Sequence, residues 1–129
     1  MLEIKRMTNN RDALEPGTVI NGYEIDTIIG GGRFSVVYRA RHILLREFVA
    51  IKEYFPLELA VRRSDGVYPH DSVGSHFHEG LRRFVDEARI LVRFRDDPTI
   101  VSCRDQFELN GTAYLVMEWG LYIAPSKAW

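Results

Sequence analysis

The sequence predicts an α+β fold in which a five-stranded antiparallel sheet packs against one principal helix. Three β-branched or alternating segments follow one another with no helical pattern between them. One amphipathic helical segment then precedes two further strand patterns, which an Asn-Gly pair joins. We therefore expect the order strand, strand, strand, helix, strand, strand.

The first three strands are predicted at residues 23–29, 35–42 and 48–54, which read YEIDTII, SVVYRARH and FVAIKEY. Three consecutive glycines separate the first two strands and favour a hairpin between them. Residues 55–77 contain two prolines, two glycines and a turn-like Ser-Asp-Gly. We expect this segment to be irregular, with a short helix near residues 57–61 as the alternative.

The principal helix is predicted over residues 81–92, which read LRRFVDEARILV. Apolar residues recur there at helical spacing and form one stripe, namely Leu81, Phe84, Val85, Ala88, Leu91 and Val92. Two strands follow. In the first, alternation predicts Val101, Cys103 and Phe107 on one face; the second is predicted at residues 112–119, after the Asn110-Gly111 turn.

The composition indicates one soluble globular domain. The chain has 129 residues, 46% of them hydrophobic and 27% charged, and a net charge of −1, so nothing favours a nucleic-acid partner. No apolar run is long enough for a membrane segment. The first 15 residues are charged and lack the apolar core of a signal peptide, and the single cysteine fits a reducing compartment. We expect a flexible leader over residues 1–15 and a cytoplasmic location.

Two motifs suggest contact with phosphate. In GGGRFSVVY, residues 30–38, glycines between two strands let the backbone approach an anion, although a plain hairpin turn also explains them. In VAIK, residues 49–52, strand alternation places Ala50 and Lys52 on one face, as a pocket for a flat ring and phosphates would need. Glu87 flanks the apolar stripe of the helix and could reach Lys52, although each residue alone would more often be solvated.

In this order, GGGRFSVVY, VAIK, EARIL, DPTIV and YLVMEW resemble the small lobe of a eukaryotic-type serine/threonine protein kinase, and VAIKEYFP and NGTAYLVMEW are most similar to bacterial members. The resemblance covers residues 22–119. It implies that Gly30 and Gly32, with Gly31 between them, belong to the loop that covers the phosphates of ATP. Phe34 matches the tip of that loop, and Ser35 stands where the family has its third glycine.

The remaining roles also carry over from the resemblance. Val37 and Ala50 match the pair that sandwiches adenine. Lys52 matches the lysine that holds the α- and β-phosphates, and Glu87 matches the helix glutamate that pairs with it. Met117 matches the gatekeeper, while the Glu118 carbonyl and the Gly120 N–H match the hinge groups that bind adenine.

The resemblance ends before the family's large lobe. We expect an ATP-binding small lobe at residues 16–119, followed by an aberrant tail at residues 120–129 that a frameshift or premature stop explains. Mg²⁺ is expected only with the large lobe. The partners implied are ATP and either a protein substrate or a second kinase chain. The alternatives are a non-catalytic nucleotide-binding or docking module and a truncated gene remnant.

One further match is predicted to be a decoy. CRDQFELN, residues 103–110, has the spacing of a kinase catalytic loop, but it lies in a strand and turn pattern, and no Asp-Phe-Gly follows.

Three other features are explained without a functional role. His70, His76 and His78 are predicted to be solvated loop histidines, so we expect no metal site. The helix arginines are expected to form a solvated basic face, namely Arg82, Arg83, Arg89, Arg93 and Arg95. Cys103 is expected in the core under the helix, near Leu91.

Overall fold

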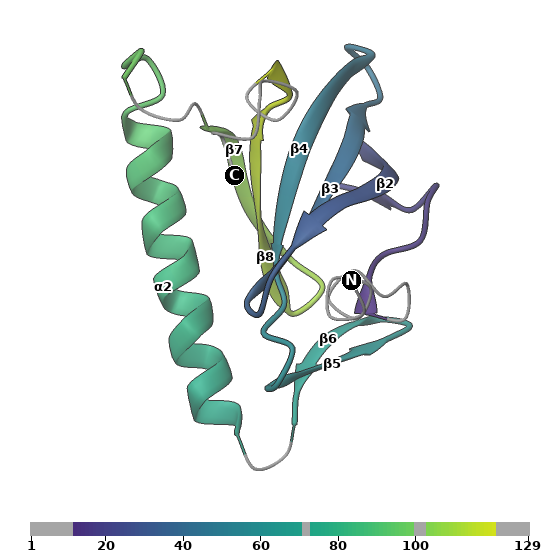
Figure 1. Ribbon diagram of the computed structural model, residues 1–129, viewed down its shortest axis with the longest axis vertical. Helices are drawn as coiled ribbons and strands as arrows, with labels where there is room; N and C mark the ends of the chain where they lie inside the picture. Colours follow the sequence, from purple (N-terminus) through teal and green to yellow (C-terminus); the bar gives the residue numbers. More distant parts are fainter. Residues whose placement is uncertain (1–11, 71–72, 100–102, 121–129) are drawn as a thin grey trace.

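The computed structural model describes residues 12–70, 73–99 and 103–120, and it confirms the α+β fold with an antiparallel sheet (Figure 1). The main sheet has the strand order β1-β2-β3-β4-β8-β7. Its strands are β1 (Val19–Ile20), β2 (Tyr23–Gly31), β3 (Ser35–His42), β4 (Glu47–Tyr54), β7 (Cys103–Leu109) and β8 (Thr112–Glu118). The sheet thus has six strands rather than five, because the two-residue β1 pairs with the start of β2.

The segment predicted to be irregular contains a second, two-stranded sheet, β5 (Ala60–Arg63) and β6 (Gly66–Pro69). The short helix considered near residues 57–61 is not formed. The hairpin packs backbone to backbone on the β7–β8 turn, where the Val67 N–H donates to the Asn110 carbonyl over 2.8 Å. A Cβ at Gly66 would lie 2.6 Å from that same oxygen, so this contact needs a glycine.

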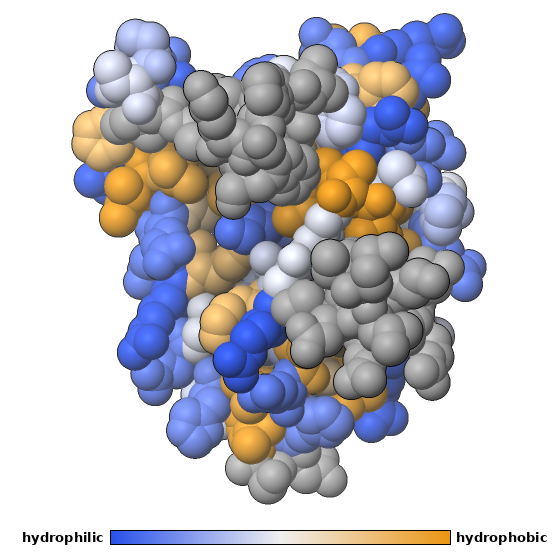
Figure 2. All heavy atoms as spheres, viewed as in Figure 1, coloured by the Kyte–Doolittle hydropathy of each residue, from blue (hydrophilic) through white to orange (hydrophobic). Residues whose placement is uncertain are grey.

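The helix α2 (Gly74–Arg93) begins at Gly74, well before the predicted residue 81. His76 and His78 therefore lie in a helix, and their assignment to a loop was wrong. Phe77, Val85 and Ala88 are buried on the side that faces the sheet. Hydrophilic residues cover the lower, outward side of this helix in Figure 2.

Two apolar clusters form the core, and Phe84 of α2 packs against both. The larger one is built around Tyr38, Ile51 and Tyr114. The smaller one lies under α2 and contains Ala88, Cys103, Leu115 and Met117, with Leu91 packed against it. The prediction that Cys103 is a core residue near Leu91 is confirmed.

Strand β7 carries a bulge that the sequence pattern did not reveal. Cys103 pairs with Met117, whereas Asp105 pairs with the adjacent Val116. This shift places Cys103 and Phe107 on opposite faces of the sheet, so their assignment to one face was wrong. Val101 lies outside the described residues. Asn110 and Gly111 form the turn, both with positive φ, which confirms that CRDQFELN is a strand and a turn.

The folded part begins before the predicted boundary at residue 16. Ala13 is buried, and the Leu14 N–H donates to the Tyr38 hydroxyl over 2.9 Å. The Arg62 guanidinium donates to the Asp12 carbonyl. The rest of the predicted leader, residues 1–11, and residues 121–129 of the predicted tail lie outside the described residues.

Candidate functional site

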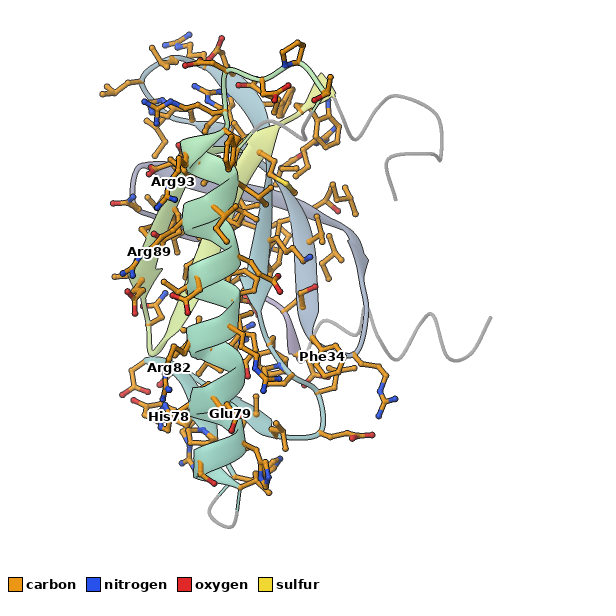
Figure 3. All side chains as sticks on the ribbon, turned by 90° about the vertical axis from the view of Figure 1, so that its left-hand side faces the viewer. Phe34, His78, Glu79, Arg82, Arg89 and Arg93 are labelled. Carbon is orange, nitrogen blue, oxygen red and sulfur yellow. The ribbon has the colours of Figure 1, made fainter. Side chains whose placement is uncertain are left out.

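A cleft of 620 Å³ opens between the β2–β3 loop, the end of β4 and the part of α2 that runs from His76 to Glu87. In Figure 3, Phe34 lies on the side of the β2–β3 loop and Glu79 lies on α2. The lining residues are Gly32, Arg33, Phe34, Ser35, Lys52, Tyr54, Pro56, Leu59, His76, Glu79, Gly80, Arg83, Phe84 and Glu87. The cleft therefore brings together five of the site residues predicted from the sequence, which are Gly32, Phe34, Ser35, Lys52 and Glu87.

Backbone hydrogen bonds hold the glycine loop in place. The Gly32 N–H donates to the Ser35 carbonyl over 2.9 Å, and the Phe34 carbonyl accepts from the Phe55 N–H over 2.9 Å. The Phe34 ring is 66% exposed at the tip. A Cβ at Gly32 would meet no atom within 4 Å, so packing within the described fold does not require a glycine there.

Lys52 is a half-buried cation with no carboxylate partner among the described residues. Among the described residues, no carboxylate oxygen lies within 4.0 Å of its ammonium. Glu87 is exposed on α2 and lines the same cleft, but it too forms no ion pair with any described residue. The ion pair expected between Lys52 and Glu87 is therefore not formed in this structure, although both side chains border one space.

The other charged groups of the cleft are engaged in pairs. Arg33 contacts Glu58 at 3.1 Å, and Arg83 contacts Glu79 at 2.7 Å along the helix. All four side chains are more than half exposed, so these pairs contribute little to stability. Because both arginines are paired, Lys52 is the cation of the described lining that is available to an anionic ligand.

Tyr54 and Gly80 set how closely α2 approaches the sheet. The Tyr54 hydroxyl donates to the Phe77 carbonyl over 2.8 Å, and its ring contacts those of Phe77 and Phe84. A Cβ at Gly80 would lie 2.3 Å from the Tyr54 oxygen. A glycine inside a helix normally costs stability, so its presence here reflects this close contact. The first turns of α2 thereby form one wall of the cleft.

Behind the cleft, a buried polar cluster anchors β4. Glu53 is fully buried and accepts hydrogen bonds from Tyr38 at 2.7 Å and from Tyr114 at 2.8 Å. Arg62 donates to both carboxylate oxygens, at 3.0 and 2.5 Å, and stacks over the Phe55 ring.

The pKa values of this cluster reflect its burial. Burial and the neighbouring Glu53 charge raise the pKa of Tyr38 and Tyr114. Burial lowers the pKa of Arg62, but its hydrogen bond and charge interaction with Glu53 outweigh this and leave that pKa raised. The cluster therefore holds the Arg62 cation beside neutral tyrosines.

The remaining predicted site residues lie outside the cleft. Val37 is paired with Lys52, and Ala50 with Met117, so all four share the face of the sheet that carries the cleft. Val37, Ala50 and Met117 are buried.

Four further predicted site residues, two from the glycine loop and two from the hinge, also lie outside the cleft. Gly30 and Gly31 pair with β3 as part of β2. Glu118 ends β8, with its carboxylate 3.7 Å from the Arg104 guanidinium, and Gly120 is exposed. None of these residues lines the cleft.

Sequence reasoning missed Tyr54 and Gly80, whose roles depend on the tertiary contact between β4 and α2. The sequence ranks Glu79 below Glu87 as a partner for Lys52, because Gly80 follows Glu79 and the predicted helix begins later. A signal for Gly80 was present, since a glycine inside a long helical pattern often marks a close contact.

Comparisons with known proteins agree with this geometry. No family model matches the chain. CBL-interacting protein kinase 22 of rice is 33% identical over 100 residues, and the serine/threonine-protein kinase PrkC of Bacillus subtilis is 38% identical over 104 residues. The apo form of PpkA-294 superposes with a TM-score of 0.77 at 38% identity, over 83% of this chain. This chain has the small-lobe fold of the serine/threonine protein kinases.

The kinase match covers a limited part of each relative. It includes 74% of this chain and 21% of the rice protein, and 80% of this chain and 13% of PrkC. For PpkA-294 it includes 38% of that chain. The kinase domain of Mycobacterium tuberculosis PknI, in a double mutant, has the same fold with a TM-score of 0.56 at 23% identity. No helix among the described residues is long and apolar enough to cross a membrane.

Proposed function

We propose that this small lobe binds ATP in the cleft, with the glycine loop over the phosphates and Lys52 on the α- and β-phosphates. The observation that carries the proposal is the half-buried Lys52 ammonium without a described counterion. A cation held partly out of water without a partner is costly, and a phosphate at this position would offset that cost. The cleft volume of 620 Å³ is within the usual range of about 300–1,000 Å³ for small-molecule sites.

The loop and the helix would have different roles around the nucleotide. Gly32 leaves open space where a side chain would stand, which lets backbone N–H groups approach phosphate oxygens. Glu87 would orient Lys52 once the helix closes on it. The adenine ring would extend beyond the described cleft along the same face of the sheet, toward Val37, Ala50 and Met117. Glu118 and Gly120 would supply backbone groups to its edge.

Mg²⁺ neutralises phosphate charge when it binds with a nucleotide. Among the described residues, no group of three His, Cys, Asp or Glu side chains could hold a metal ion. The described cleft therefore offers charge complementarity for phosphate through Lys52.

The parent activity would be transfer of the γ-phosphoryl group of ATP to a serine or threonine hydroxyl of a protein. The 129 residues contain no Asp-Phe-Gly, and the Arg-Asp of residues 104–105 is part of strand β7. We expect this stretch, tested alone, to bind nucleotide but to transfer no phosphate. A cytoplasmic location also stays a prediction.

Calorimetric titration with a non-hydrolysable ATP analogue tests the proposal. Lys52→Ala should weaken binding about tenfold or more, since a charge-assisted contact is worth about 1.5–3 kcal/mol. Arg63→Ala, an exposed cation of the β5–β6 hairpin, should leave the affinity within a factor of two. Absence of binding by the unmodified chain would contradict ATP binding and favour the docking-module alternative.

A second assay concerns catalysis. The chain is incubated with γ-labelled ATP and a generic protein substrate, and Lys52→Ala provides the background. We expect no label above that background on the substrate or on the chain. Labelling that exceeds the Lys52→Ala control would contradict the prediction that this stretch is inactive alone.

A further inference from the structure

The chain that leaves β4 runs along the tip of the glycine loop. Residues 55–58 connect β4 to the β5–β6 hairpin and lie beside the β2–β3 loop (Figure 1). The Phe55 N–H donates to the Phe34 carbonyl over 2.9 Å. The Leu57 N–H donates to the Arg33 carbonyl over the same distance. We call residues 55–58 the loop latch.

The loop latch is itself anchored on the core. The Phe55 side chain is only 1% exposed, and the Arg62 guanidinium stacks over its ring at 4.8 Å. Arg62 in turn donates to the buried Glu53 carboxylate. Pro56 is buried, and its carbonyl accepts from the Leu59 N–H, which closes a turn. The latch therefore has a fixed place on the sheet, and its two hydrogen bonds hold the loop tip to that place.

Without these bonds the glycine loop would have unusual conformational freedom. Gly30, Gly31 and Gly32 are consecutive, and glycine loses more backbone entropy on ordering than any other residue. A loop that its ligand must first order lowers the affinity for that ligand, whereas a loop that is already ordered does not. The β3–β4 ladder ends at the pair of Ser35 with Tyr54, so the latch extends the ordering beyond the ladder to the tip.

The loop latch also sets the orientation of the peptide groups at the tip. Carbonyl oxygens repel phosphate oxygens, and those of Arg33 and Phe34 both accept hydrogen bonds from the latch. In a planar trans peptide the N–H points opposite to the preceding carbonyl, and no described peptide bond is cis. The N–H groups of Phe34 and Ser35 therefore point away from the latch. Backbone N–H groups are the donors that a glycine loop offers to an anion.

We propose that the loop latch is a positioning element for the nucleotide phosphates, and that the Leu57 N–H keeps the glycine loop in its binding geometry. This inference rests on the proposed function. Neither Phe55 nor Leu57 lines the cleft, so both act through the backbone of the loop rather than on the ligand. The effect is selective for ligands with phosphates, because adenosine lacks the groups that the loop contacts.

Leu57→Pro tests the inference by removing one N–H. Leu57 follows Pro56 in the turn that the Leu59 N–H closes, and this position of a turn favours proline. The matched variant is Leu57→Ala, which keeps the N–H and measures the loss of the partly buried side chain alone. Thermal unfolding checks that both variants retain the fold.

Three measurements are made on both variants and on the unmodified chain. Calorimetry gives the affinity for a non-hydrolysable ATP analogue, and a chemical-shift titration gives the affinity for adenosine. Backbone ¹⁵N relaxation at Phe34 reports the order of the loop without ligand.

We expect Leu57→Pro to bind the ATP analogue about threefold to tenfold more weakly than Leu57→Ala, as the loss of one backbone hydrogen bond requires. The two variants should bind adenosine equally, and the Phe34 amide should have a lower order parameter in Leu57→Pro. Equal affinities of the two variants for the analogue, or an equal loss for adenosine, would overturn the inference and leave ATP binding intact. Absence of analogue binding by the unmodified chain would instead overturn the proposed function, and the inference with it.

A measurement on the unmodified chain alone keeps the inference testable if Leu57→Pro does not fold. The Leu57 amide should be protected from hydrogen exchange in the ligand-free chain. Its protection should rise when the ATP analogue binds, because binding and the latched geometry favour each other. Exchange of this amide at the rate of an unfolded chain, or protection that the analogue does not change, would overturn the inference.

Discussion

Lys52 and Glu53 are consecutive residues of β4, and their side chains leave opposite faces of the sheet. Lys52 borders the cleft without a described carboxylate partner, whereas Glu53 is fully buried and bonded to Arg62. One strand thus presents an unpaired cation to the site and anchors itself through a paired anion behind it. The anchor ties β4 to the β5–β6 hairpin and, through Arg62, to the backbone of Asp12.

Replacing Arg62 should be strongly destabilising. Arg62→Ala leaves the Glu53 carboxylate buried without its cation and removes the stack over Phe55. We expect a loss of about 3–5 kcal/mol in the free energy of unfolding, measured by urea denaturation. The control is Arg63→Ala, one residue away and exposed, which should change it by less than about 0.5 kcal/mol. Equal effects of the two variants would show that Glu53 does not need its partner.

Gly80→Ala should destabilise the chain although alanine is the better helix former. The added Cβ would lie 2.3 Å from the Tyr54 oxygen and force α2 away from β4, at a cost of about 1–3 kcal/mol. Gly74→Ala, at the start of the same helix with no atom within 4 Å, should be neutral or stabilising. Adding Tyr54→Phe, which removes the clashing oxygen, should recover part of the loss in Gly80→Ala. A neutral Gly80→Ala in thermal unfolding would contradict the close contact.

The β7–β8 turn should be more sensitive to substitution than another turn with the same backbone strain. Gly111 has φ +75°, and a Cβ there would lie 2.6 Å from the Val67 carbonyl, whereas Gly22 has φ +85° and open space. Gly22→Ala should cost about 1–2 kcal/mol for the left-handed conformation alone. Gly111→Ala should cost clearly more, because the β5–β6 hairpin must also move. Similar losses in chemical denaturation would mean that the hairpin does not pack on this turn.

The single cysteine should make stability depend on alkaline pH. Burial raises the pKa of the Cys103 thiol to about 11, above the value of about 8.5 for an exposed thiol. The folded state holds the proton more tightly, so this contribution is fully present below about pH 8.5 and is lost as the pH rises through about 11. Cys103→Ala should flatten this part of the stability–pH curve. Rapid reaction of the folded chain with a thiol reagent at neutral pH would contradict the burial.

The strands that positioned the site could be predicted from local pattern. β3 has the bounds that alternation indicated, and β4 extends by one residue. The β5–β6 hairpin could not be predicted, because Pro56, Gly66 and Pro69 are loop signals when no tertiary partner is visible. The hairpin is stabilised by Arg62 and by the backbone contact with Asn110, both long-range interactions. An alternating sequence pattern likewise does not reveal the β7 bulge.

The helix start was missed for a local reason. Val73 occupies the N-cap without a side-chain hydrogen bond, and the first turn has no acidic residue, so the usual start signals are absent. Because the predicted helix begins too late, Glu79 and Gly80 could not be recognised as lining residues of the cleft. Glu87 was placed correctly on the flank of the helix, but its distance from Lys52 depends on how α2 docks, which sequence spacing does not define.

The central claim is that nucleotide phosphates bind at the glycine loop and Lys52. The most direct measurement is an amide chemical-shift map of the ¹⁵N-labelled chain titrated with ATP. We predict the largest shifts at Gly32, Phe34 and Lys52, with Val67 and Tyr68 of β6 unchanged as internal controls. Saturable shifts confined to the loop and β4 would support the claim. No shifts at these residues, or shifts spread evenly over the sheet, would contradict it.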